Sequence, residues 1–262
     1  MKAQYILNGD ISCPGRYEID STMTLREIID TLGGGVANGK KCKAVQIGGP
    51  SGGLLTAEQL DLPLDFKQLA PFGVRRGDSV ITVIDEDRCI VDAAYRVMKL
   101  TQQEFCGKCV SCREGTRRMT EMLNSLCKYE MDEKGFQLLK DVGEMVHITA
   151  LCNLGKGSFN TMDAAIKNFG DEFAAHIAGK CELCDAGREP LVPAYLSRDL
   201  KQIVIDPEMC RGCSKCSRFC HAEAISGQIK SPFHINQDLC VHCYSCIEVC
   251  PFGAIKEVEI NG

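Results

Sequence analysis

The hydrophobic pattern of the chain first predicts short strands. In the first 86 residues, QYILNGDI, GRYEID, KAVQIGG and DSVITVID combine apolar alternation with flanking turn residues, which is typical of β-strands. Between the second and third stretch, TLREIIDTLGGG predicts a short helix with apolar residues from Leu25 to Leu32 on one face and a capping box of Thr24 and Glu27. Strands around one helix predict a small α+β domain of β-grasp type.

Helical periodicity follows from about residue 87. It covers DEDRCIVDAAYRVMKLTQQE, a helix from REGT to about Tyr129, DEKGFQLLKDVGEMVHI, and a last helix after Cys152. The REGT helix places four apolar residues on one side: Met119, Met122, Leu123 and Leu126. Residues 185–200, DAGREPLVPAYLSRDL, contain two prolines and no apolar period, and they predict a linker. We therefore expect domains at 1–86, 87–184 and 201–262.

The last domain carries the most specific motif. The spacing C-x2-C-x2-C-x3-C occurs twice, as in two-cluster bacterial ferredoxins, where the fourth Cys of each run ligates the other run's cluster. One 4Fe-4S cluster is predicted at Cys210, Cys213, Cys216 and Cys250, and another at Cys240, Cys243, Cys246 and Cys220. Disulfides and zinc ribbons are weaker interpretations, because zinc needs only two C-x2-C pairs. His221 stands where the other run has Pro251.

Two further constellations lie in the helical region. Three cysteines at C-x2-C-x2-C spacing offer three cluster ligands and need a fourth from elsewhere: Cys106, Cys109 and Cys112. Downstream, H-x4-C-x2-C together with a cysteine left over from the preceding helix gives a Cys3His set, typical of structural zinc: His176, Cys181, Cys184 and Cys127. Cys127 is included from its position alone, and a buried thiol is the alternative.

The composition of the chain favours some classes of function over others. Eighteen cysteines without a signal peptide or a membrane-spanning apolar run indicate the reducing cytoplasm and metal sites rather than disulfides. A net charge of −5 and the lack of a long Lys/Arg run disfavour nucleic acid. GGPSGG lacks the Lys and the following helix of a phosphate-binding loop, so it predicts a structural turn. Cys13 and Cys42 have no partners at metal-ligand spacing, and we expect them to be ordinary thiols.

A family resemblance extends over essentially the whole chain. Through PGRYEI, TLREII, GGPSGG, CGKCVSCREGT, LCNLGKG and FGDEFAAHI, the region from Tyr5 to about His176 resembles the C-terminal half of the NADH-oxidising flavoprotein subunit of respiratory complex I. It is more similar still to the β subunit of NAD-linked, electron-bifurcating iron hydrogenases. The resemblance implies a soluble-ligand-binding β-grasp (SLBB) domain, then a four-helix domain whose cluster takes Cys152 as its fourth ligand, then a two-cluster ferredoxin domain. It also implies a zinc site between the last two domains, although the family's Cys pair is spaced more widely than Cys181 and Cys184.

The resemblance also sets the expected function. Members that oxidise NADH carry a flavin- and nucleotide-binding domain before the β-grasp part, and no GxGxxG follows a predicted strand here, so we expect no FMN or NAD on this chain and no hydride transfer by it alone. With three 4Fe-4S clusters and one Zn2+, it is predicted to be an electron-transfer subunit of a cytoplasmic, anaerobic, flavin-dependent oxidoreductase complex of the bifurcating type, linking NAD(P)H, ferredoxin and another redox couple. Expected partners are flavin-bearing and 2Fe-2S thioredoxin-like subunits and soluble ferredoxin, with no nucleic acid and no membrane span. The alternatives are a free-standing polyferredoxin shuttle and a redox-sensing scaffold.

Overall fold

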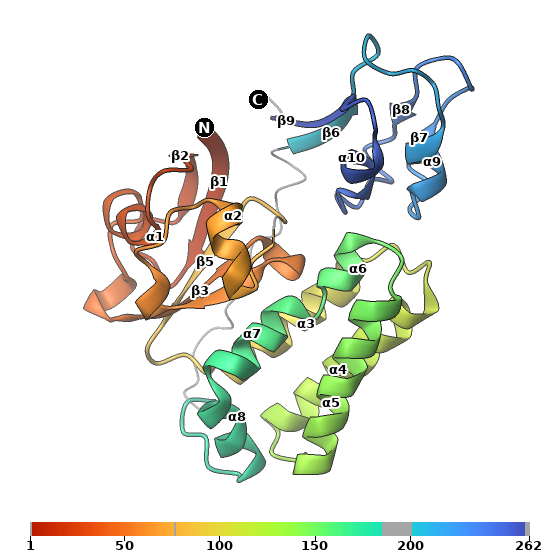
Figure 1. The fold of residues 1–262 in the computed structure, drawn as a ribbon. Helices are drawn as coiled ribbons and strands as arrows, with labels where there is room; N and C mark the ends of the chain where they lie inside the picture. The colour runs from red at the N-terminus through yellow and green to blue at the C-terminus, as the bar shows by residue number, and fades with distance from the viewer. Residues whose placement is uncertain (1, 76, 185–200, 260–262) are drawn as a thin grey trace.

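The structure is a computed structural model that describes residues 2–75, 77–184 and 201–259. The predicted linker, 185–200, lies outside the described residues. A sheet-containing N-terminal part, a helical part and a small C-terminal part follow one another, so the chain is of the predicted α+β class (Figure 1). No helix in the described ranges is long and apolar enough to cross a membrane.

The N-terminal part is built on one mixed sheet. Its strand order is β2-β1-β5-β3-β4; β1 and β5 pair in parallel, and the other pairs are antiparallel. The strands are β1 (Lys2–Gly9), β2 (Gly15–Asp20), β3 (Cys42–Ile47), β4 (Gly53–Thr56) and β5 (Val80–Asp85). The four predicted strands are confirmed, and β4 was not predicted.

One face of this sheet is covered by the predicted helix. α1 (Leu25–Glu27) continues as a wider helical turn at Ile28–Leu32, and α2 (Phe66–Leu69) lies further along the chain. The capping box is confirmed: the Glu27 amide donates to the Thr24 hydroxyl at 3.1 Å, and the Thr24 amide donates to the Glu27 carboxylate at 2.9 Å. Leu25 and Ile28 are fully buried against the sheet, so this amphipathic turn closes the N-terminal core.

The helical part contains α3 (Ile90–Glu104), α4 (Val110–Cys127), α5 (Glu133–Thr149), α6 (Asn153–Gly157), α7 (Asn160–Asn168) and α8 (Gly170–Ile177). α4 packs against both α3 and α5, and its four predicted apolar residues are buried (Figure 1). The single helix expected after Cys152 is three helices. The chain turns between α6 and α7, where the Phe159 ring packs so closely on Gly143 of α5 that a Cβ there would lie 2.2 Å from it.

The other face of the sheet packs on the helices. Ala44, Leu54 and Ile84 of β3, β4 and β5 belong to the same buried core as the helical residues. The turn at Gly49–Ser51, within GGPSGG, contacts α6 and α7, where the Asn160 side-chain amide donates to the Ser51 carbonyl at 3.0 Å. The Gly-rich segment therefore packs as a structural turn in this interface.

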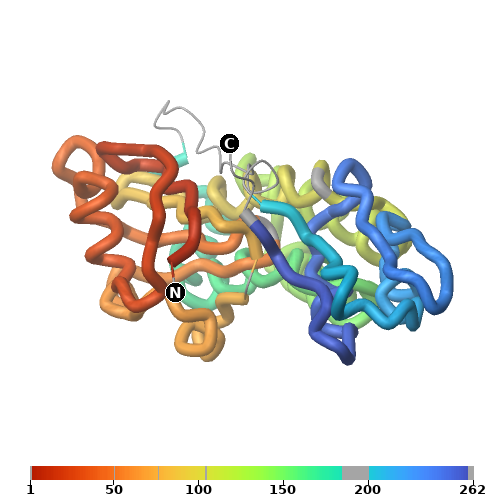
Figure 2. Tube along the Cα trace, turned by 90° about the horizontal axis from the view of Figure 1, so that it is seen from above, coloured from red at the N-terminus to blue at the C-terminus, as the bar shows by residue number. Residues whose placement is uncertain are grey.

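The C-terminal part consists of two small two-stranded sheets and two short helices. β6 (Lys201–Ile205) pairs antiparallel with β9 (Ile255–Glu259), and β7 (Ile225–Ser226) pairs with β8 (His234–Ile235). The helices are α9 (Lys215–Phe219) and α10 (Ser245–Val249). This part lies beside the helical part, at the end of the molecule away from β2 (Figure 2). The Lys201 ammonium donates to the Ser79 hydroxyl of the N-terminal part.

Candidate metal centres

The eight cysteines of the C-terminal part line two separate cavities. One cavity is lined by Cys210, Cys213, Cys216 and Cys250, here called the outer cage. The other is lined by Cys220, Cys240, Cys243 and Cys246, here called the inner cage. In each cage three cysteines come from one run and the fourth from the other, which is the grouping that the spacing predicts.

Equivalent backbone turns build the two cages. Ser214 and Tyr244, both directly after the second Cys of their runs, have positive φ angles of 59° and 60°. In this left-handed conformation, uncommon for residues other than glycine, the chain turns sharply and enters α9 or α10. The turn directs three thiols of each run into one cavity, as capping three corners of a cluster requires.

Burial makes two of these thiols, Cys216 and Cys246, weaker acids. Burial raises the pKa of Cys246 to about 12, and the neighbouring cysteines contribute to the rise. Burial likewise raises the pKa of Cys216. Thiolates packed together in an apolar cavity need a positively charged metal core to be stable. The donor set therefore fits an iron–sulfur cluster.

The third group, here called the middle cage, comes from two helix starts. Cys106 and Cys109 precede α4, Cys112 lies in its first turn, and Cys152 directly precedes α6. Burial and the adjacent Cys109 and Cys106 raise the pKa of Cys112. Electrostatic coupling to Cys106 also contributes to the raised pKa of Cys152, so the distant fourth cysteine lies beside the local three.

The middle and inner cages touch. The Cys152 thiol is hydrogen-bonded to Cys243, which raises the pKa of Cys152 and lowers that of Cys243. Next to this contact, the Asn153 amide donates to the Ser245 hydroxyl at 3.4 Å. An ion pair of 2.6 Å between Lys108 and Glu223 also bridges the two parts. The middle and inner cages, whose contacting residues are about ninety positions apart in sequence, are therefore in direct contact.

A fourth cluster of ligands lies at the opposite end of the helical part. The ligand atoms of Cys89, His176, Cys181 and Cys184 all lie within 4.8 Å of one another. The His176 Nε2 atom is 3.1 Å from the Cys89 sulfur and 3.4 Å from the Cys184 sulfur, and the two sulfurs are 3.2 Å apart. Zinc binds such ligands at about 2.0–2.3 Å in a tetrahedron. The ligand atoms around the ion must then lie only slightly further from one another than the three separations given above.

This geometry brings three of the four predicted zinc ligands together and places a different cysteine beside them. Cys127 was predicted as the fourth ligand, but Cys89 completes the group and Cys127 is not a member of it. Cys127 nevertheless lies next to the group, where its hydrogen bond to Cys184 raises the pKa of Cys184. Cys127 was chosen from its position, as the cysteine left over from the preceding helix, whereas Cys89 stands at the start of α3, 87 residues before His176.

The surroundings of His176 orient its ring. Its Nδ1 atom lies 3.1 Å from the Leu126 carbonyl, so this nitrogen donates and Nε2 faces the thiols. Tyr129 stacks on the imidazole with ring centroids 5.3 Å apart, and its hydroxyl donates to the Cys181 carbonyl at 2.7 Å. These contacts position the imidazole and the downstream Cys loop.

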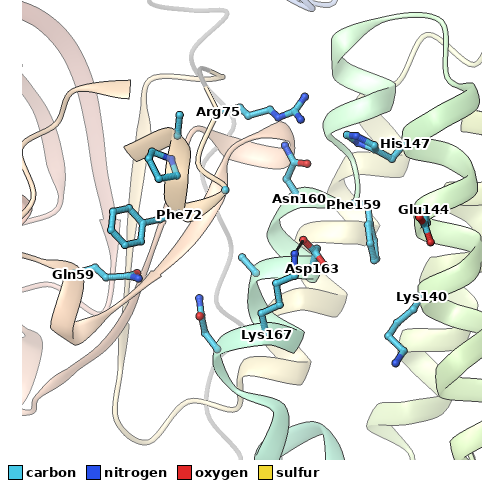
Figure 3. A pocket seen from close by; sticks show the side chains of 15 residues that line it. Gln59, Phe72, Arg75, Lys140, Glu144, His147, Phe159, Asn160, Asp163 and Lys167 are labelled. Carbon is cyan, nitrogen blue, oxygen red and sulfur yellow. Dashed lines mark hydrogen bonds and ion pairs between the residues drawn. The ribbon is translucent and has the colours of Figure 1, made fainter. Parts of the chain in front are cut away.

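A cleft of about 880 Å³ separates the N-terminal part from α5 and α7. Figure 3 shows Phe72 and Arg75 on one side, and Lys140 of α5 and Lys167 of α7 on the other. Lys167 pairs with Asp163 at 2.6 Å. None of the lining residues is a cysteine. The cleft is therefore separate from the metal chemistry of the three cages.

Two family models match the chain. Residues 92–176 match the NADH-ubiquinone oxidoreductase-F iron-sulfur binding region, and residues 203–257 match the 4Fe-4S dicluster domain. The first range contains the four cysteines of the middle cage, and the second contains the inner and outer cages. The match supports iron–sulfur binding by both parts.

The chain is also similar to curated proteins and to a solved structure. The chain is 37% identical over 228 residues to the NADP-reducing hydrogenase subunit HndC of Solidesulfovibrio fructosivorans, covering 87% of this chain and 44% of that one. It is 35% identical to the F subunit of NADH-quinone oxidoreductase of Mycobacterium bovis, covering 67% and 39%. An NAD+-reducing [NiFe]-hydrogenase structure matches in fold with a TM-score of 0.59 at 24% identity, covering 67% and 30%. The chain spans less than half the length of the curated relatives that it matches here.

Proposed function

We propose that this chain, a homologue of the C-terminal part of the NADH-quinone oxidoreductase F subunit and of the hydrogenase subunit HndC, is an iron–sulfur electron-transfer subunit of an NAD(P)H-linked oxidoreductase complex. Its three cysteine cages would each hold one 4Fe-4S cluster, which supplies single-electron chemistry. The chain's own residues provide thiolates, exclude water and fix how the cages are arranged. The contact between Cys152 and Cys243 is the observation that carries this proposal.

The contact sets an order for the cages. Cys152 belongs to the middle cage and Cys243 to the inner cage, so these two cages adjoin without intervening protein. The inner and outer cages exchange their fourth cysteines, Cys220 and Cys250, which couples them closely. The order that follows is middle, inner, outer. A chain that merely stored clusters would not need two sets of ligands from different domains to meet at one point.

The group of Cys89, His176, Cys181 and Cys184 fits a structural zinc ion. Three thiols and one imidazole form a closed tetrahedral set, and closed sets of this kind stabilise folds rather than catalyse reactions. The ion would tie the start of α3 to the loop after α8. Its role would be to fix the end of the helical part from which the chain continues to the C-terminal part.

The domain assignment supports the same function. We assign residues 1–86 to an SLBB-like β-grasp domain, 87–184 to a 4Fe-4S helical domain and 201–262 to a ferredoxin-like domain. The strand order β2-β1-β5-β3-β4, with a parallel central pair and a covering helix, supports the first assignment. Each domain contacts the next, so the cages are held by one continuous scaffold.

The names of the relatives support membership of a multi-subunit complex. These relatives are named as parts of an NADP-reducing hydrogenase and of NADH-quinone oxidoreductases. We propose that a flavin-bearing partner supplies the nucleotide site of the complex. We propose a cytoplasmic complex that also contains a 2Fe-2S subunit and exchanges electrons with soluble ferredoxin, with bifurcation as its mode of action.

Anaerobic purification of the tagged chain from its native host tests the proposal. We expect roughly twelve iron atoms and one zinc per chain, together with co-purified flavoprotein and dehydrogenase-like subunits identified by mass spectrometry. A chain that carries this metal but purifies alone would favour a free-standing shuttle. A chain without iron would refute the electron-transfer role.

A further inference from the structure

The two cysteine runs of the C-terminal part differ in charge at equivalent positions. Residues thirty apart correspond, because the first cysteines of the runs are Cys210 and Cys240. Between its cysteines the first run carries three cations and no acid: Arg211, Lys215 and Arg218. The second run has Val241, Ser245 and Glu248 at the same positions and no Lys or Arg. The ligand spacing is shared, so this difference reflects what each run faces.

The second run faces the rest of the chain. His242 is only 6% exposed, and the Tyr244 hydroxyl lies 3.4 Å from the Gly77 carbonyl and 2.7 Å from Glu257. Ser245 accepts the hydrogen bond from Asn153. Val241 and Ser245 thus lie in a run that packs on the N-terminal and helical parts, where Lys or Arg side chains would be buried at a large free-energy cost.

The first run faces solvent. Arg211, Lys215 and the ligand Cys213 line the outer cage at the surface, and Arg211 and Cys213 are exposed. Arg218 follows on α9, one residue before the exposed Phe219. Among the residues that the structure describes, none of the three cations forms an ion pair. Two exposed cations, Arg211 and Lys215, therefore line the outer cage on a chain whose net charge is −5.

Apolar side chains accompany these cations. Met209 is 46% exposed and directly precedes Cys210, and Phe252 is 43% exposed and lines the outer cage. Exposed aromatic and Met side chains with Arg at their border are the composition of a protein-binding patch. We call Met209, Arg211, Lys215, Arg218 and Phe252 the basic face.

We infer that the basic face is the docking surface for an acidic one-electron carrier protein. The inference rests on the proposed function, since it concerns the outer end of the same series of cages. Positive charge attracts an acidic carrier from a distance and orients it, and the apolar residues then exclude water at the contact. The exchange moves one electron without making or breaking a bond: the carrier is reduced as this chain is oxidised, or the reverse.

A matched pair of charge variants tests the docking surface. The full chain, with its clusters reconstituted anaerobically, is titrated with an acidic plant-type ferredoxin by calorimetry at low and at physiological ionic strength. The test variant is R211Q/K215Q/R218Q. The control, K128Q/K134Q/K180Q, removes three cations near the end of α4 that lies about 27 Å from the middle cage, so both variants change the net charge equally.

We expect the test variant to bind the carrier about tenfold more weakly at low ionic strength and to lose most of the salt dependence, because these charges steer the encounter. The control should bind within about twofold of the wild type. Should the triple variant lose iron, Arg218→Glu, which copies the residue of the second run, replaces it with the same expectation.

Three outcomes would overturn the inference. Equal weakening in the control would reduce the effect to net charge. Unchanged binding with a lowered reduction potential of the clusters would mean that the cations only balance the charge of the outer cage. Displacement of the carrier by double-stranded DNA at equal affinity would point to a different ligand. A wild-type chain that holds iron but binds no carrier refutes only the docking surface, whereas a chain that holds no iron refutes the proposed function.

Discussion

Replacing Cys89 by Ser should remove the zinc ion that we propose for the group of Cys89, His176, Cys181 and Cys184. The Cys89 side chain is 5% exposed, and its sulfur lies 3.1 Å from His176 Nε2 and 3.2 Å from the Cys184 sulfur. The substitution leaves three ligands for an ion that structural sites bind with four. Cys127→Ser is the matched control: it also changes a cysteine next to Cys184, but one outside the ligand group, and should keep the zinc.

The loss of stability can be worked from the sequence separation. The ion would join residue 89 to residue 181 and close a loop of about 92 residues. In the chain-entropy model of a cross-link, such a closure stabilises the folded state by about 4.6 kcal/mol at 25 °C. Any affinity of the unfolded cysteines for zinc lowers this figure, so we expect Cys89→Ser to reduce the free energy of unfolding of the helical part by roughly 2–5 kcal/mol.

Two anaerobic measurements check this prediction. Mass spectrometry of the metals gives zinc per chain, and far-UV circular dichroism during urea titration reports the unfolding of the helices. The wild type treated with a chelator strong enough to remove zinc should resemble Cys89→Ser. The assignment is wrong if Cys127→Ser loses its zinc while Cys89→Ser retains one equivalent. The entropic reasoning is wrong if Cys89→Ser loses the ion and its urea midpoint stays that of the wild type.

Three other changes test separate parts of the structure. Cys109→Ser should remove about four iron atoms per chain and leave the paramagnetic signals of the C-terminal clusters in place, because only the middle cage loses a ligand. Gly157→Ala should lower the free energy of unfolding by about 1–3 kcal/mol in urea titration, since its new Cβ would lie 2.6 Å from the Ser51 Cβ, whereas Gly170→Ala, with nothing within 4 Å, should be neutral or slightly stabilising. Burial raises the pKa of Cys42 to about 11, so at pH 8 roughly one thiol in a thousand is ionised; peptide mass spectrometry should find Cys42 unmodified by iodoacetamide in the folded chain and modified as the pH approaches 11 or after unfolding.

The grouping of the cage cysteines could be predicted because it depends on local chain geometry. Three cysteines at spacings of three residues fall on one tight turn, whatever the remaining fold does, and the left-handed Ser214 and Tyr244 complete that turn. The capping box of Thr24 and Glu27 was predictable for the same reason, since all its atoms lie within four residues.

Features that depend on distant packing were not predictable. Cys89 has no metal-like spacing to any other cysteine, and only the packing of α3 on α8 brings it to His176. β4 is four residues long and follows a Gly-rich turn, and its polarity alternates too little to indicate a strand. The helix after Cys152 breaks near Phe159, whose ring packs on Gly143 of a different helix, a contact that the local sequence does not indicate.

The order of the cages could be predicted only in part. Both C-terminal runs have the same ligand spacing, so the ligands alone cannot tell which run faces the middle cage. The residues between the ligands indicate which run faces the middle cage. A run that packs on another domain must avoid uncompensated charge, whereas a run in water can carry it. Tyr244 and Ser245 make the contacts to Gly77 and Asn153, and the equivalent Ser214 and Lys215 lie in the run that faces solvent. Once one cage is known to touch the rest of the chain, the charged run is the one that holds the solvent-facing cage, as the exposure of Arg211 and Cys213 shows.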